Sequence, residues 1–240
     1  MRNSFLQKLF RFGKRDSSSA LPPDEWNWLM PPRDVHETEA WDRHWQNQIS
    51  HGLGPGIFDI FCRDEELVRA MRERGMTTVL CAGNGISQEP RALAEAGFRV
   101  TALDSSKVAI EIAQAWRFTP EQSQHYFPLD LCQSGGNVNF VIGDLLDPMA
   151  SPGPFDVVIE RCTLQLFPPD ERGGAVDALA RRLQPEGIFL SHCHNGAWRP
   201  GEDPIHVVES VFAEKGWTIE NGYQALQSRG RVALLSLSTG

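Results

Sequence analysis

Long apolar runs, a secretory signal and patterned cysteines are all missing from this 240-residue sequence. No stretch reaches the roughly 18 apolar residues of a membrane-spanning helix, and the first residues lack the apolar core of a secretory signal. The few cysteines are Cys62, Cys81, Cys132, Cys162 and Cys193, and no two form a CxxC pair. Such an odd, unpatterned set of thiols is typical of a reducing compartment, so we expect a cytoplasmic protein.

Several motifs of nucleotide-binding and metal-binding proteins are absent as well. No GxxxxGKS/T sequence is present, which excludes the phosphate loop of P-loop proteins. His192 and His194 alternate on one predicted strand and therefore share a face, but no further ligand stands at a usable spacing. We therefore expect no metal ion.

Positive charge is concentrated at the start of the chain. The net charge is −8 and residues 1–15 carry +5, which leaves −13 (−8 less +5) for residues 16–240. A body this acidic disfavours nucleic acid and favours a small-molecule or protein substrate. The basic start, with its interspersed Phe and Leu, is compatible with membrane-surface contact, but a frayed tail is the simpler expectation. We divide the chain into a tail with a proline-rich connector (1–33) and a folded domain (34–240).

Apolar strands alternate with helical segments from residue 77 onward. Strands are expected over 77–83, 99–104, 138–144, 155–161 and 188–194, and helices over 86–96, 105–116, 171–183 and 204–215. Two further strands, 217–226 and 231–238, are expected to form a hairpin, and helices are expected around Trp41 and Trp45 and over 64–74. This order predicts an α/β fold: a Rossmann-like, doubly wound, mostly parallel sheet with a C-terminal β-hairpin.

The first strand runs into the loop Gly83-Asn84-Gly85, which points to a bound nucleotide. Asp104, followed by Ser105, ends the second strand, and a carboxylate there can accept hydrogen bonds from both hydroxyls of a ribose. The third glycine of a dinucleotide fingerprint is replaced by Gln88, which weakens that interpretation. Alone, the loop and the carboxylate fit NAD and S-adenosylmethionine equally well.

Two more strand ends decide between these cofactors. Gly143, Asp144 and Leu145 follow the third strand, where a short acidic turn can receive an adenine amino group. Glu160 and Arg161 end the fourth strand, where a methyl donor would face its acceptor. Together the four strand ends resemble those of class I S-adenosylmethionine-dependent methyltransferases over residues 77–195, which implies that cofactor and an enzyme with an N-terminal helical lid.

One position departs from that family. Many members carry an acid two residues before the first motif glycine, where it helps to hold the methionine amine, and this chain has Cys81 there. Cysteine accepts a hydrogen bond from an ammonium poorly, so backbone carbonyls are expected to do more of that work.

A second resemblance is to one particular group within that family. The segment FDVVIERCTLQLFPPDER is similar to the corresponding region of thiopurine methyltransferases, where Arg161 matches a functional arginine. Trp41 and Trp45 match an upstream W-x3-W that lines the cofactor, and Leu80 and Cys81 match residues of the first motif. This resemblance implies a small acceptor with a soft nucleophile, such as a thiol, a thiopurine or a related anion.

The acceptor side leaves alternatives open. Arg161 is expected to position an anionic acceptor, with Glu160 or His194 as the candidate base if the acceptor is a neutral amine or hydroxyl. His194 closes the fifth strand and is also a candidate substrate contact. A nicotinamide-dependent oxidoreductase and a non-catalytic S-adenosylmethionine-binding interaction protein remain as competing functions.

Overall fold

The computed structural model describes residues 31–52, 62, 64–116, 135–193, 210–215, 217–224 and 231–237. Its helices are α2 (Thr38–Ser50), α3 (Glu65–Glu73), α4 (Glu89–Glu95), α5 (Lys107–Ala115) and α7 (Pro169–Ala180), with the short 3-10 helix η4 (Leu164–Leu166). Its strands are β1 (Thr78–Ala82), β2 (Arg99–Asp104), β3 (Asn137–Ile142), β4 (Phe155–Arg161), β5 (Leu183–Cys193), β6 (Trp217–Gln224) and β7 (Arg231–Leu237). The predicted basic tail lies outside the described residues.

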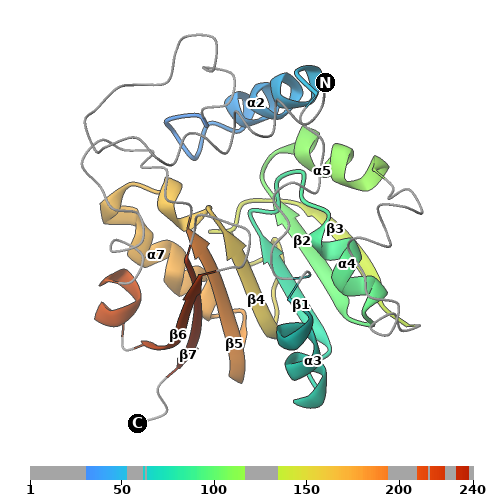
Figure 1. Ribbon diagram of the computed structural model, residues 1–240. Helices are drawn as coiled ribbons and strands as arrows, with labels where there is room; N and C mark the ends of the chain where they lie inside the picture. The colour runs from blue at the N-terminus through green and yellow to red at the C-terminus, as the bar shows by residue number, and fades with distance from the viewer. Residues whose placement is uncertain are drawn as a thin grey trace.

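The strands form one sheet in the order β3-β2-β1-β4-β5-β7-β6 (Figure 1). The pairs from β3 to β5 are parallel, whereas β7 runs antiparallel to both β5 and β6. The predicted α/β fold with its parallel sheet is therefore confirmed. β1 lies between β2 and β4, so the order of the strands reverses next to β1, and ligands of such sheets bind at the carboxyl ends of these strands.

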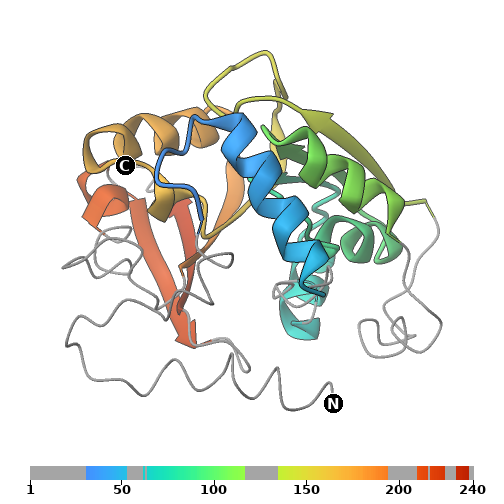
Figure 2. The same cartoon turned by 90° about the horizontal axis from the view of Figure 1, so that it is seen from above.

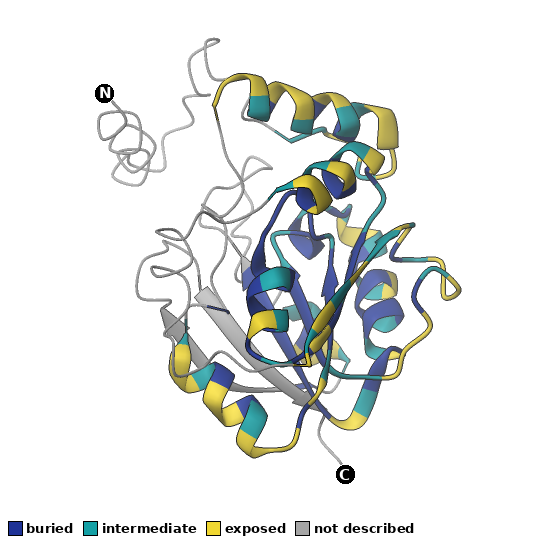
Figure 3. Cartoon of the chain, turned by 90° about the vertical axis from the view of Figure 1, so that its right-hand side faces the viewer, coloured by how far each residue is buried: buried dark blue, intermediate teal, exposed yellow. Residues whose placement is uncertain are grey.

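Two apolar layers hold the sheet between helices (Figure 3). Side chains alternate across β1: Val79 and Cys81 face the cluster that contains α3 and α4, and Leu80 and Ala82 face the cluster that contains α7. Because both faces are covered, β1 is apolar after Thr78 and is buried from Val79 to Ala82.

Helix α2 precedes the sheet in sequence and lies across the carboxyl ends of its strands, beside α5 (Figures 1 and 2). It turns Trp41, His44 and Gln48 inward, so its inner face is aromatic and polar rather than aliphatic. The predicted tryptophan helix thus covers the edge of the sheet where a ligand would bind.

Element boundaries differ from the sequence predictions mainly at β5. This strand was expected to begin at residue 188, after a loop at QPEG, but it begins at Leu183. The pairing steps from Phe155–Leu183 to Val157–Ile188, so the four intervening residues are accommodated as an irregularity in the strand. The helix predicted over 171–183 correspondingly ends at Ala180.

Some expectations fall outside the described ranges. Residues 204–209 of a predicted helix and residues 225–230, between β6 and β7, are among them. No helix within the described ranges is long and apolar enough to cross a lipid bilayer.

Candidate active site

The loop after β1 is built from two glycines with left-handed backbone, at φ +63° for Gly83 and +53° for Gly85. A Cβ on Gly83 would lie only 2.1 Å from Thr163 Oγ1, which belongs to the loop after β4. The Thr163 hydroxyl lies 3.4 Å from the carbonyl oxygens of both Ala82 and Gly83. Glycine at position 83 therefore lets the ends of β1 and β4 approach each other closely.

Asp104, at the end of β2, faces this loop. Its Oδ2 accepts a 2.7 Å hydrogen bond from the Gly85 amide, and its Oδ1 accepts a 2.8 Å bond from the Ser106 amide. Burial and, to a smaller extent, the nearby Asp42 raise the pKa of the Asp104 carboxyl to about 6, against the opposing effect of the two amide bonds. A carboxylate offers about four acceptor sites, so two remain for ligand hydroxyls.

Trp45 of α2 covers the same loop. A Cβ on Gly85 would lie 2.7 Å from Trp45 Cζ2, so the indole rests directly on this glycine. Trp41 packs beside it, with ring centroids 6.3 Å apart. The buried Trp45 Nε1 has no hydrogen-bond partner among the residues that the structure describes. Because an unpaired buried donor costs free energy, Nε1 is a group that a ligand oxygen would satisfy.

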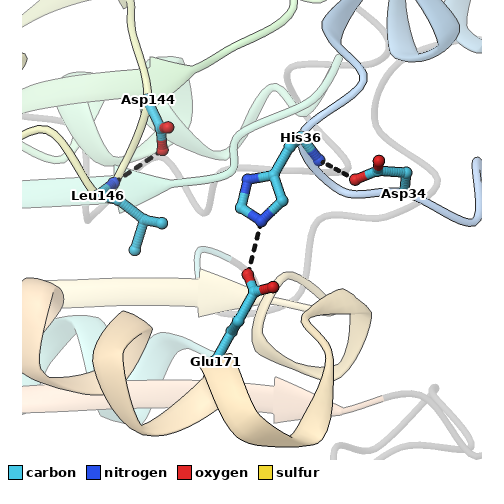
Figure 4. Close-up of polar contacts among 5 residues, drawn as sticks. All are labelled: Asp34, His36, Asp144, Leu146 and Glu171. Atoms are coloured by element: carbon cyan, nitrogen blue, oxygen red, sulfur yellow. Dashed lines mark hydrogen bonds and ion pairs between the residues drawn. The ribbon is translucent and has the colours of Figure 1, made fainter.

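The loop after β3 brings the predicted adenine-side residues to the same edge. The Gly143 amide donates to the Asp104 carbonyl at 2.9 Å, which joins this loop to the end of β2. The Asp144 carboxylate accepts from the Leu146 amide at 2.8 Å and so shapes the turn (Figure 4). Leu145 is buried, and its carbonyl accepts a 2.8 Å bond from Arg182.

Glu160 organises the turn at the end of β4. It is completely buried: Oε2 accepts from the Thr163 and Leu164 amides at 3.0 and 3.1 Å, and Oε1 accepts from the Ser191 hydroxyl. Burial raises the pKa of its carboxyl, against the pull of these donors. Both oxygens are therefore engaged by the protein itself, and this geometry supports a positioning role for Glu160.

Arg161 and Cys162 follow at the top of β4 and are partly buried. Cys162 has φ +58°, a conformation that is strained for a non-glycine residue and that clusters at functional sites. Its Sγ lies 3.8 Å from Nδ1 of the buried His192 on β5. Arg161 thus stands where the chain turns away from the sheet, next to the glycine loop.

A contact that the sequence did not predict fastens the segment before α2 to the body. His36 Nε2 lies 2.6 Å from Glu171 Oε2 of α7, and the His36 amide donates to Asp34 Oδ1 (Figure 4). The hydrogen bond to Glu171 raises the pKa of His36, with smaller contributions from Asp34 and Asp144. The His36 ring also meets Phe167 edge-on. The segment that leads into α2 is therefore anchored on the α7 side of the sheet.

Most of the predicted site residues are brought together by this geometry. Those at the carboxyl edge of the sheet or on α2 are Trp41, Trp45, Gly83, Asn84, Gly85, Asp104, Ser105, Gly143, Asp144, Leu145, Glu160 and Arg161. Leu80 and Cys81 instead pack inside the core, on the α7 side and on the α3 and α4 side respectively. His194 lies outside the described residues. No group of three possible metal ligands occurs in the described part of the chain.

Sequence reasoning missed Asp42, Thr163 and His36. Each acts through a partner far away in the chain, and no local motif marks any of them. Thr163 alone carried a weak signal, because it follows the Glu160-Arg161 pair that was singled out.

The site fits the S-adenosylmethionine implied by the resemblance. Asp104 keeps acceptor capacity for ribose hydroxyls, the glycine loop brings its backbone to the carboxyl end of β1, and Trp45 offers a donor that no described residue pairs with. These three features come from different elements and converge on one strand end.

Two comparisons of the sequence with known proteins give one match. Residues 80–191 match the sequence model of a methyltransferase domain. No curated protein sequence matches the chain.

Solved structures with the same fold include three informative cases. Magnesium protoporphyrin IX methyltransferase from Synechocystis, with S-adenosylmethionine bound, is 16% identical with a TM-score of 0.52, over 99% of this chain and 98% of that one. A TehB-like methyltransferase from Corynebacterium glutamicum is 20% identical with a TM-score of 0.51, over 85% and 100%. A protein described for the conversion of a disulfide bond into a thioacetal group during echinomycin biosynthesis is 24% identical with a TM-score of 0.55, over 83% and 90%.

These structures share the fold, and the sequence match places a methyltransferase domain on the strands and loops that build the site. Residues 80–191 are thus a methyltransferase domain, and the fold around it is the one found in S-adenosylmethionine-dependent methyltransferases.

Proposed function

We propose that this enzyme methylates a small molecule through a soft nucleophile, such as a thiol, a thiopurine or a related anion. The observation that carries the proposal is that the Glu160 carboxylate already accepts hydrogen bonds at both of its oxygens. The acid at the end of β4 has both oxygens engaged by Ser191 and by two backbone amides, so it is poorly placed to take a proton from an acceptor. A thiolate or another anion needs no such base.

The cofactor supplies an activated methyl group, and the chain's own residues supply position and a dry environment. Asp104 would hold the ribose hydroxyls, and Asp144 would face the adenine. Trp45 closes over the glycine loop and excludes water from it. Arg161 would attract and orient an anionic acceptor with its planar set of donors.

Two further observations support sulfur as the acceptor atom. The β4 segment is similar to that of thiopurine methyltransferases, and one protein with this fold is described for chemistry on a disulfide. The acidic body disfavours a nucleic-acid acceptor. A nicotinamide-dependent oxidoreductase is not favoured, because residues 80–191 match a methyltransferase domain.

A screen with labelled methyl donor tests this function. Thiols, thiopurines, iodide and metabolite extracts are incubated with the protein, and label transferred to each acceptor is measured. We expect transfer to at least one thiol or thiopurine. Transfer only to amines or hydroxyls would refute the proposed acceptor class, and cofactor binding without turnover on any acceptor would favour a binding protein.

We expect Glu160→Gln to keep the fold and most of the turnover, and Glu160→Ala to lower stability by about 2–4 kcal/mol. Glutamine can still accept the amide bonds after β4, whereas alanine leaves several buried donors unpaired. Thermal melts and methyl transfer on both variants check this. If Glu160→Gln melts normally but loses more than about a hundredfold in turnover, Glu160 is the proton acceptor after all.

We expect Gly85→Ala to weaken cofactor binding about tenfold. Alanine at a left-handed φ costs roughly 1–2 kcal/mol, and its Cβ would displace the Trp45 ring from the loop. Gly75→Ala is a matched control, because Gly75 has φ +74° and no atom within 4 Å of an added Cβ. Both variants should melt at lower temperature, but only Gly85→Ala should lose affinity. Equal affinities would show that contact between Trp45 and the loop is unimportant for binding.

A further inference from the structure

Asp42 joins the lid helix α2 to the start of α5. Its Oδ1 accepts a 2.5 Å hydrogen bond from the Ser106 hydroxyl and a 3.1 Å bond from the Val108 amide. Ser106 is itself the N-cap of α5, because its hydroxyl oxygen accepts from the Ala109 amide at 3.1 Å. A carboxylate near a helix N-terminus is favoured electrostatically, so this is a stable docking point for α2.

A chain of contacts leads from Asp42 through Ser106 to the Asp104 carboxylate, and from there through Gly85 back to helix α2. The Ser106 amide donates to Asp104 Oδ1, and Asp104 Oδ2 accepts from the Gly85 amide. Gly85 in turn lies under the ring of Trp45, which follows Asp42 by three residues on α2. Lid, helix cap, carboxylate and glycine loop therefore form one closed circuit of direct contacts.

We propose that Asp42 is a positioning residue that couples closure of α2 over the glycine loop to the orientation and charge of Asp104. The inference rests on the proposed role of Asp104 in holding the cofactor's ribose. Asp42 holds Ser106 by accepting a hydrogen bond from the Ser106 hydroxyl, and the Ser106 amide in turn holds one oxygen of Asp104. When the lid closes, the carboxylate is held in one orientation while the negative charge of Asp42 comes close to it.

Asp42 is the charged group that bears most directly on Asp104. Of the other charges on the elements packed here, Arg43 pairs with Glu37 and Glu39, and Lys107 pairs with Glu111, all on exposed surfaces. Asp144, on the neighbouring loop, accepts from the Leu146 amide. Asp42 therefore helps to keep the pKa of Asp104 near 6, behind the larger effect of burial.

A pH dependence of cofactor binding follows from this arrangement. Ribose hydroxyls donate to the ionised form of Asp104, so affinity should fall as the pH drops through about 6. His36 also titrates, with a pKa raised by its contact with Glu171, and its protonation at low pH strengthens that contact and so opposes this loss. The acid limb of the binding curve is therefore assigned to Asp104.

The test measures binding of S-adenosylhomocysteine by calorimetry from pH 5 to 8 for the wild type, Asp42→Asn, Asp42→Ala and Glu39→Gln. Asparagine keeps the acceptor oxygen and removes the charge, so affinity at high pH should stay within about threefold while the acid limb moves to lower pH. Alanine removes the docking contacts and should weaken binding about tenfold or more at high pH. Glu39→Gln removes an exposed charge from the same helix and should change neither quantity.

The outcomes separate this inference from the proposed function. If the wild type binds but the Asp42→Asn curve superimposes on it, or Asp42→Ala binds normally, the positioning role of Asp42 is refuted and the function stands. If the wild type binds no S-adenosylhomocysteine at any pH, the proposed function fails and the inference fails with it. Should Asp42→Ala not fold, the shift of the acid limb in Asp42→Asn decides alone.

Discussion

Replacing Asp104 with alanine is expected to weaken cofactor binding by about 1.5–3 kcal/mol, which is roughly ten- to more than a hundredfold. In the proposed site, the change removes a charged acceptor for the ribose hydroxyls. It also frees the Gly85 and Ser106 amides that Asp104 now holds at 2.7 and 2.8 Å. Calorimetric titration of the variant with S-adenosylmethionine, at a pH well above 6, gives the loss directly.

The fold should survive this substitution. The raised pKa means that the folded state disfavours the charged form of Asp104, so the free protein loses stability as the pH rises from about 4 to 6. Removing that charge therefore offsets part of the lost hydrogen bonding. Asp104→Asn is the milder partner, since it keeps one acceptor oxygen. Unchanged affinity with a collapsed melting temperature would show that Asp104 serves only the structure of the loop.

Replacing Arg161 with alanine is expected to lower acceptor kcat/KM by about ten- to several-hundredfold and to leave donor affinity within a few fold. Arg161 lies at the top of β4, whereas the proposed ribose and adenine contacts lie at the ends of β2 and β3. Loss of one or two charge-assisted hydrogen bonds to an anion, at roughly 1.5–3 kcal/mol each, gives this range. Donor titration and acceptor kinetics on the same preparation separate the two effects.

Arg161→Lys is the informative control. If the guanidinium binds the acceptor through two parallel hydrogen bonds, lysine should recover little of the rate, and if only charge matters it should recover much of it. A collapse of donor binding in either variant would place Arg161 at the methionine end of the cofactor or under the lid.

The parts of the site that depend on local spacing could be predicted from the sequence. The step from β1 into Gly83 and Gly85, and Asp104 at the end of the next strand, are set by short-range patterns that a parallel sheet brings together. The parallel pairing and the buried β1 follow from apolar segments separated by helices.

Long-range contacts could not be predicted in the same way. Asp42 meets Ser106 across 64 residues, and His36 meets Glu171 across 135. Both contacts depend on where α2 crosses the sheet, which no local pattern states. The role of Glu160 could not be predicted either, since the sequence shows an acid at a strand end but not the Thr163 and Leu164 amides that donate hydrogen bonds to its carboxylate.

The start of β5 illustrates a different difficulty. Proline and glycine in QPEG predicted a loop, yet the strand begins earlier because Leu183 pairs with Phe155 and the Phe155 amide donates to the Arg182 carbonyl at 2.7 Å. Here tertiary pairing outweighs the local turn preference. The consequence for the site is small, because the irregularity lies at the opposite end of β5 from Ser191 and His192.

The central claim is that the carboxyl edge of this sheet binds S-adenosylmethionine, and calorimetry on the unmodified chain tests it most directly. The protein is titrated in parallel with S-adenosylmethionine, S-adenosylhomocysteine and NAD at neutral pH. The geometry of Asp104, the glycine loop and Trp45 predicts micromolar binding of both sulfur compounds and weaker or no binding of NAD. Tight NAD binding together with no binding of either sulfur compound would contradict it.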